Sequence, residues 1–170
     1  MASASTENNN EKVTLKTSDG EEFLVEKQAV LQSTTIKHIL EDRPSDDAIP
    51  LPNVDAKTLA LVLEYCNKHA NASSKEEEEE EKKSKEEEKF DSEFLKDMKK
   101  GALFDLVLAA NYLNIKGLLD IVTQKIADSI KDLSHQKVRA MFNIENDFTP
   151  EEEAEVRKEN EWAFEGFEDN

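Results

Sequence analysis

The stretch LFDLVLAANYLNIKGLLDIVTQKIADSI, from Leu103 to Ile130, is the most apolar part of this 170-residue chain and decides its fold. Eleven of the fourteen residues in 102–115 are apolar, which predicts a helix over 100–114 that is buried nearly all round. A second helix is predicted over 117–131. Its apolar stripe recurs every four residues, at Leu118, Val122, Ile126 and Ile130. A chain this short builds only a modest core, so part of this apolar surface is expected to need a second protein to cover it.

The charge balance limits the partners that this chain can have. The formal net charge is −17, and the acidic residues concentrate on both sides of the least charged part, 90–150. Phosphate binding needs a basic face, so nucleic acid is not an expected partner. A single cysteine, Cys66, excludes an internal disulfide. Without a signal peptide or an 18-residue apolar run, we expect a soluble, intracellular chain that does not enter membranes.

The segment before the apolar stretch has the pattern of a small α/β domain. KVTLKTSDGEEFLVEK predicts a β-hairpin that turns at Asp19-Gly20. A short helix follows, then a helix capped by Ser33 or Thr34 and ended by Pro44, and AIPLP predicts a brief strand. Asp55 then caps a longer helix. The inner stripe of that helix consists of Leu59, Val62, Leu63 and Cys66.

Residues 71–89, NASSKEEEEEEKKSKEEEK, are of low complexity and carry almost no apolar side chain. Such a segment cannot offset its ordering entropy, which favours a disordered loop or a frayed extension over the alternative, a charged single helix. DSEFLKDM then predicts a separate short helix, capped by Asp91 or Ser92.

The segment after the apolar stretch predicts two short helices. SHQKVRAMF begins at a Ser134 cap. NDFTPEEEAEVRKENEW has Thr149 as N-cap, Pro150 at the first helical position and Glu152 three residues after the cap, which predicts a capping box. Short amphipathic helices beside a wide apolar stripe predict a groove that receives helices of another protein, and a plain helical core is the alternative.

No catalytic or metal-binding pattern is present. His38, His69 and His135 lie far apart, and none has a second His or Cys at ligand spacing. Cys66 lies on an apolar stripe and is interpreted as a small core residue. Four glycines form no phosphate-binding loop. We therefore expect no enzyme activity, cofactor, metal or small-molecule substrate.

Four segments carry a family resemblance: SDGEEFLVE, IPLPNV, LFDLVLAANYLNIKGLLD and FNIENDFTPEEEAEVRKENEWAFE. In this order, from about Lys12 to Glu165, they resemble the adaptor subunit of SCF (Skp–cullin–F-box) ubiquitin ligases, and ENEWAFE is most similar to plant members. The resemblance implies an α+β, mostly helical fold. It consists of a POZ (BTB-like) domain, a small mixed sheet with packed helices, and a C-terminal helical extension that binds an F-box.

The resemblance also implies a division of the chain and a function. The expected parts are a disordered tail (1–10), a POZ domain (11–70), an acidic linker (71–89), a helical dimerisation and F-box-binding domain (90–165) and a tail (166–170). The expected function is that of a non-catalytic adaptor, in nucleus and cytoplasm, between a cullin and F-box proteins. The alternatives are an acidic chaperone for basic proteins such as histones, and a self-associating POZ scaffold.

The resemblance also implies where the two binding surfaces lie, and the family's motifs assign residues to them. The pair NY in AANYLNI assigns cullin binding to Asn111 and Tyr112, and a core position is the alternative for Tyr112. The F-box surface is assigned to Leu118, Val122, Ile126, Ile130, Val138, Phe142, Ile144, Phe148 and Trp162, any of which is otherwise internal packing. Three segments depart from the family pattern: KDLSHQKVR stands where GKTPEEIR is usual, Phe90-Asp91 stands where Trp-Asp is usual, and the Lys- and Glu-rich segment is longer and more charged than is usual. The first departure concerns the start of a partner-binding helix and therefore the choice of F-box protein.

Overall fold

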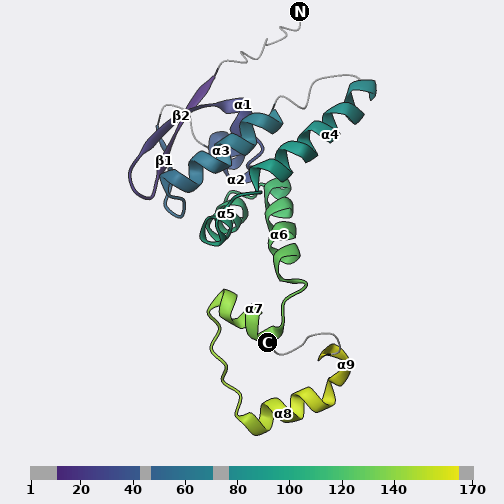
Figure 1. The fold of residues 1–170 in the computed structure, drawn as a ribbon. Coiled ribbons are helices and arrows are strands. Elements are labelled where there is room, and N and C mark those ends of the chain that lie inside the picture. Colours follow the sequence, from purple (N-terminus) through teal and green to yellow (C-terminus); the bar gives the residue numbers. More distant parts are fainter. Residues whose placement is uncertain (1–10, 43–46, 71–76, 165–170) are drawn as a thin grey trace, which may run out of the picture. The chain divides into compact units, whose positions relative to one another are not determined.

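The computed structural model describes residues 11–42, 47–70 and 77–164, with the backbone alone described for 77–84 and 163–164 (Figure 1). The chain divides into two compact units, one up to Gln124 and the other from Lys125. The expected tails and the expected helix end at Pro44 lie outside the described residues.

The first unit contains a three-stranded mixed sheet (Figure 1). Strands β1 (Lys12–Thr17) and β2 (Glu22–Glu26) pair antiparallel, while β3 (Ile49–Leu51) pairs parallel with β1, giving the order β2-β1-β3. The predicted hairpin is confirmed. Gly20 has a φ of 88° in its turn, a conformation that glycine adopts without steric cost. Val13 and Leu15 alternate with more exposed residues and are buried in the core.

Three helices precede the acidic segment: α1 (Lys27–Val30), α2 (Thr34–Asp42) and α3 (Ala56–Ala70). Both predicted caps are present. The Ser33 hydroxyl accepts a hydrogen bond from the Ile36 backbone N–H (3.1 Å), and Asp55 Oδ1 accepts one from the Thr58 N–H (2.7 Å). The predicted inner stripe of α3 is buried at all four positions: Leu59, Val62, Leu63 and Cys66.

The acidic segment is a helix, α4 (Glu77–Phe94), so the interpretation of 71–89 as a loop is wrong for 77–89. Residues 91–94 form the last turn of α4 and do not start a separate helix. The physical reason lies at the C-terminal end of α4. Phe90 and Phe94 stack at 5.6 Å between ring centroids, and His69 of α3 lies 2.9 Å from an Asp91 carboxylate oxygen. These contacts supply packing energy that the acidic residues themselves lack.

Helices α5 (Lys100–Tyr112) and α6 (Lys116–Ile130) confirm the two helices predicted in the apolar stretch. The prediction that the first is buried nearly all round is wrong, because Leu108 is 67% exposed while Leu106 is fully buried. Helix α5 packs against α3, but Leu108 is left in contact with water. The number of apolar residues in a helix does not predict which of its faces are packed against other elements.

The second unit contains the end of α6 and three short helices, α7 (His135–Phe142), α8 (Pro150–Glu159) and α9 (Glu161–Phe164). Ser134 caps α7 as predicted, accepting from the Lys137 backbone N–H. The predicted capping box of α8 is also confirmed, with Pro150 in its first turn. Across the part of the chain described here, no helix has the length and apolar character needed to span a membrane.

Candidate partner-binding surfaces

The C-terminal end of α5 is fixed by two hydroxyl groups of the segment that starts α2. Ser33 Oγ donates to the Leu113 carbonyl (2.5 Å), and Thr35 Oγ1 donates to the Tyr112 carbonyl (2.9 Å). Asn114 then takes a left-handed conformation, with a φ of 51°, and α5 ends. Because carbonyls at a helix end lack partners within the helix, these two hydroxyls hold this turn in place.

This fixed turn presents the two residues assigned to cullin binding. Asn111 is exposed and Tyr112 is half-buried. Leu108 precedes Asn111 by three residues and Tyr112 by four, so all three lie on one face of α5. Its side chain is 67% exposed. Sequence reasoning missed Leu108 because it treated the whole helix as core, although the spacing to Asn111 and Tyr112 was available as a signal. The cullin role of Asn111 and Tyr112 stays a prediction.

The apolar stripe of α6 is not one continuous surface. Leu118 and Val122 are fully buried, whereas Ile126 and Ile130 are half-buried. The assignment of Leu118 and Val122 to the F-box surface therefore needs correction, because a partner cannot touch them in this conformation. Leu118 and Val122 are internal packing residues, which was the alternative for these positions. Of the stripe, only Ile126 and Ile130 have surface that a partner can contact.

The second unit exposes most of the other side chains assigned to F-box binding. Val138 is half-buried on α7. The exposed fractions at the other assigned positions are 37% for Phe142, 55% for Ile144, 44% for Phe148 and 75% for Trp162. Val156, on α8, is 39% exposed and was not in the predicted set. The signal for it was an apolar residue on an otherwise polar helix.

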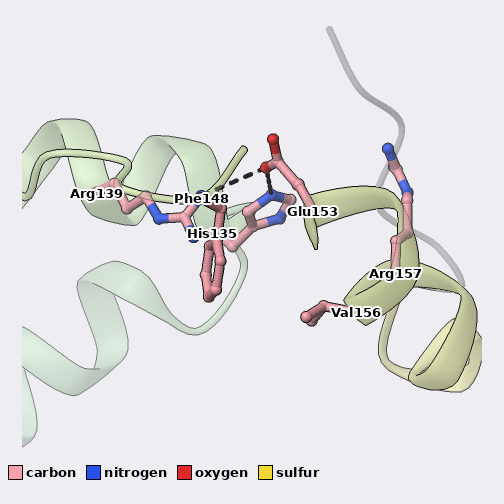
Figure 2. Close-up of a pocket in the computed structure, with 6 residues that line it drawn as sticks. All are labelled: His135, Arg139, Phe148, Glu153, Val156 and Arg157. Atoms are coloured by element: carbon pink, nitrogen blue, oxygen red, sulfur yellow. Dashed lines mark hydrogen bonds and ion pairs between the residues drawn. The ribbon is translucent and has the colours of Figure 1, made fainter. Parts of the chain in front are cut away.

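One carboxylate links the segments of the second unit. Glu153 Oε1 accepts from Arg139 Nη1 (3.5 Å) and lies 3.6 Å from His135 Nε2, as Figure 2 shows. Its other oxygen accepts from Asn146 Nδ2 (3.4 Å). The Arg139 guanidinium also lies 5.7 Å from the centre of the Phe148 ring. The side chains of the two ion pairs are 24% to 37% exposed, so each pair contributes little alone, but together they connect α7 to α8.

A small pocket of about 150 Å³ lies beside this carboxylate (Figure 2). The pocket is lined by His135, Arg139, Phe148, Glu153, Val156 and Arg157. It combines one aromatic and one aliphatic side chain with charged groups, which suits a single side chain of a partner better than a substrate. No sequence spacing indicated it, because its lining residues come from two helices and the segment between them.

The capping box of α8 also has an electrostatic effect on Glu152. The Thr149 backbone N–H and hydroxyl both donate to Glu152 Oε2, each at 2.9 Å. These hydrogen bonds lower the pKa of the Glu152 carboxyl, because they favour its charged form.

The cysteine and the three histidines are the remaining side chains of a type that can be reactive or bind a metal ion. Cys66 is buried, and burial raises the pKa of its thiol to about 12, which confirms its interpretation as a core residue. His38 is exposed on α2, while His69 and His135 each face one carboxylate. No cluster of three or more His, Cys, Asp or Glu suited to a metal ion occurs among the residues that the structure describes.

Comparison with known proteins gives two family matches on this chain. Residues 11–71 match the tetramerisation domain of the Skp1 family, and residues 116–163 match its dimerisation domain. SKP1-like protein 1 of Oryza sativa subsp. japonica is 55% identical over 165 residues, covering 90% of this chain and 95% of its own length. SKP1-like protein 1A of Arabidopsis thaliana is 49% identical over 157 residues, covering 91% and 98% respectively. The chain belongs to the Skp1 family.

Membership of the Skp1 family confirms the resemblance and the fold class that it implied. The match over 11–71 covers the mixed sheet and helices α1 to α3, and the match over 116–163 begins with α6 and extends into α9. SKP1-like protein 20 of Oryza sativa subsp. japonica, 46% identical over 166 residues, extends the similarity to a more distant plant member. Helix α4 lies between the two matched segments.

Proposed function

We propose that this Skp1-family chain is a non-catalytic adaptor of an SCF-type cullin–RING ubiquitin ligase, which bridges a cullin N-terminal region to F-box substrate receptors. One observation carries the proposal. Phe142, Ile144 and Trp162 of the second unit are 37%, 55% and 75% exposed, in a chain with a net charge of −17. Exposed apolar side chains on short helices and on the segment between them mark an interaction site for a partner that covers them.

The energy available from this surface is moderate. Complete burial of one large apolar side chain contributes roughly 1.5–3 kcal/mol. Five exposed apolar residues at about half that value give roughly 4–8 kcal/mol, and association itself costs several kcal/mol. The five are Phe142, Ile144, Phe148, Val156 and Trp162. Tight capture therefore needs a partner that also covers the half-buried Ile126 and Ile130.

The mechanism proposed is geometric. A protein that holds a substrate receptor on one surface and a cullin on another raises the effective concentration of substrate at the ubiquitin-conjugating enzyme. The two surfaces lie on different elements. Asn111 and Tyr112 end α5, whereas the exposed apolar residues belong to α7, α8, α9 and the segment between α7 and α8. Each surface can therefore be changed without changing the other.

Co-purification with an F-box helix segment and with a cullin N-terminal fragment tests this function. Phe142→Glu is expected to reduce F-box capture while cullin binding persists. Leu24→Glu is the control, because Leu24 is also an exposed apolar side chain (65% exposed) but lies on β2 of the first unit. If Leu24→Glu and Phe142→Glu reduce F-box capture equally, the exposed surface of the second unit is not the binding site.

A second candidate function is an acidic chaperone for basic proteins, and the helical conformation of α4 favours keeping it. An ordered helix holds the glutamates of 77–81 at fixed spacing, which a loop would not. Replacing these five residues by glutamine should abolish chaperone binding and spare F-box capture. Chaperone binding should also disappear by a few hundred millimolar salt, because exposed charges are screened there. A homodimer that no F-box segment dissociates would instead support a POZ scaffold.

We further propose that the chain works in both nucleus and cytoplasm, where its proposed partners would meet their substrates. Imaging of a fluorescent fusion in plant cells tests this location. Confinement to a single membrane-bounded organelle would contradict it.

A further inference from the structure

The segment between α7 and α8 is an exposed connection that ends in a Thr-Pro pair. Residues 144–149 have neither helix nor strand structure, and all six are exposed (Figure 1). Thr149 itself has an extended backbone, with φ −69° and ψ 158°. Exposed irregular segments are where modifying enzymes reach a chain. The chain contains four prolines, and Pro150 is the one that directly follows a serine or threonine.

We propose that Thr149 is a phosphorylation site for a proline-directed Ser/Thr protein kinase, and that the phosphate weakens capture of an apolar partner helix by the second unit. The site stands on the Thr149-Pro150 pair, the exposed and extended Thr149, and the exposed irregular segment before it. The effect on capture rests on the proposed adaptor function.

The chemistry is an ordinary phosphoryl transfer from ATP. Thr149 Oγ1 attacks the γ-phosphorus, the bond from that phosphorus to the β–γ bridging oxygen breaks, and ADP leaves. The hydroxyl proton passes to the catalytic aspartate of the kinase. The product is a phosphothreonine that carries a charge of about −1.5 to −2 at neutral pH.

The phosphate replaces the capping box with a repulsive contact. In the unmodified chain the Thr149 hydroxyl donates to Glu152 Oε2 at 2.9 Å and accepts from the Glu152 N–H at 3.3 Å. A phosphate ester has no proton to donate there, and its charge repels the Glu152 carboxylate. The phosphate oxygens still accept hydrogen bonds from the first-turn N–H groups, so α8 is retained while Glu152 is displaced.

The position of the phosphate explains its effect on partner binding. Thr149 directly follows Phe148, which is 44% exposed and lines the pocket with Val156. A phosphate dianion on the residue next to Phe148 must lose part of its hydration when an apolar helix covers Phe148, and this desolvation is costly. Capture of such a helix should therefore weaken by about tenfold.

The capping box also predicts how fast the site reacts. The Thr149 hydroxyl has to leave Glu152 before it enters a kinase active site. Glu152→Ala removes that partner and should speed phosphorylation by a proline-directed kinase. A kinase that recognises acidic residues three positions after the threonine would instead be slowed by the same change. This one variant therefore separates the two kinase classes.

The test incubates the full folded chain with an activated mitogen-activated protein kinase and ATP, and locates the phosphate by mass spectrometry. One phosphate is expected at Thr149, absent from Thr149→Ala and Pro150→Ala and incorporated faster in Glu152→Ala. A Thr-Pro substrate peptide in the same tube shows that the kinase is active. A folded chain that stays unmodified beside a phosphorylated peptide overturns the site, and so does phosphorylation that survives in Pro150→Ala.

Two readouts on the phosphorylated chain test the consequence. In a carbon-detected NMR titration the pKa of Glu152 should rise relative to the unmodified chain, which shows that the capping box has been lost. Affinity for an F-box helix segment should fall about tenfold. An unchanged affinity overturns the regulatory role. Failure of the unmodified chain to bind that segment would contradict the adaptor function itself and leave the mass-spectrometric result for Thr149 to stand separately.

Discussion

Gly117, in the first turn of α6, provides a quantitative test of how the first unit is packed. A Cβ atom added there would lie 2.6 Å from the Tyr65 hydroxyl oxygen and 3.8 Å from Cζ of the same ring. The hydroxyl cannot swing away easily, because the Tyr65 ring stacks on His69 with 4.2 Å between centroids and lies 6.5 Å from Phe94. Gly117→Ala should therefore overpack this contact.

The expected magnitude follows from two opposed terms. Overpacking a rigid site costs about 1–3 kcal/mol. Replacing glycine by alanine in a helix gains up to about 1 kcal/mol, and less in the first turn. Gly117→Ala should therefore lower the free energy of unfolding by about 1–2 kcal/mol. With Tyr65→Phe the nearest contact of the added Cβ becomes the ring carbon Cζ at 3.8 Å, an ordinary van der Waals distance, so the same alanine should be neutral or slightly stabilising.

Native-state hydrogen exchange of the α5 backbone amides measures this effect in the first unit alone, which avoids treating a two-unit chain as two-state. The four proteins of the cycle are wild type, Gly117→Ala, Tyr65→Phe and the double variant. Their coupling energy should be about 1–3 kcal/mol, and the sign of the alanine effect should change between backgrounds. Equal destabilisation by alanine in both backgrounds would refute the assigned role of the hydroxyl.

Three further predictions concern other parts of the chain. Thr149→Ala should lower α8 stability by about 1 kcal/mol, seen as faster exchange of the first-turn amides, while α7 amides stay unchanged. Cys66 should resist alkylation at pH 8 until the chain unfolds. Because its folded pKa of about 12 lies above the ordinary thiol value of 9.0, the thiol stabilises the fold below pH 9, and this contribution decreases as pH rises from 9 toward 12 in a urea titration. Asn111→Lys with Tyr112→Lys should abolish co-purification of a cullin fragment and preserve F-box capture, and equal loss of both partners would instead indicate a broken fold.

The features that depend on local sequence are predicted correctly. The Thr149 capping box, the Ser134 cap and the hairpin turn at Gly20 all depend on residues within a few positions of one another. Their geometry is set by neighbouring backbone groups, so the residue types suffice to predict them. The family resemblance extended this to the mixed sheet, since the pairing of β1 with the distant β3 has no local signal.

The predictions from sequence fail where a helix, a pocket or the exposure of a side chain depends on distant parts of the chain. The prediction of a loop at 77–89 is wrong because α4 is held by contacts of Phe90 and Asp91 with His69 on α3, which lies about twenty residues earlier in the chain. The pocket around Glu153 was not foreseen at all, because Arg139 and His135 reach it from another helix. Such contacts join residues more than a dozen positions apart, and no periodicity records them.

The sequence by itself determined most of the helices and strands other than α4, where most of them start and that their combined apolar surface is large, because periodicity and capping act over one or two turns. Tertiary structure alone decided which apolar residues remain in contact with water. Leu106 and Leu108 are the same residue type two positions apart, and Val122 and Ile126 share one stripe, yet the first of each pair is fully buried and the second is not. The physical reason is that burial depends on what packs against a surface, and the neighbours that cover Leu106 and Val122 do not extend over Leu108 and Ile126.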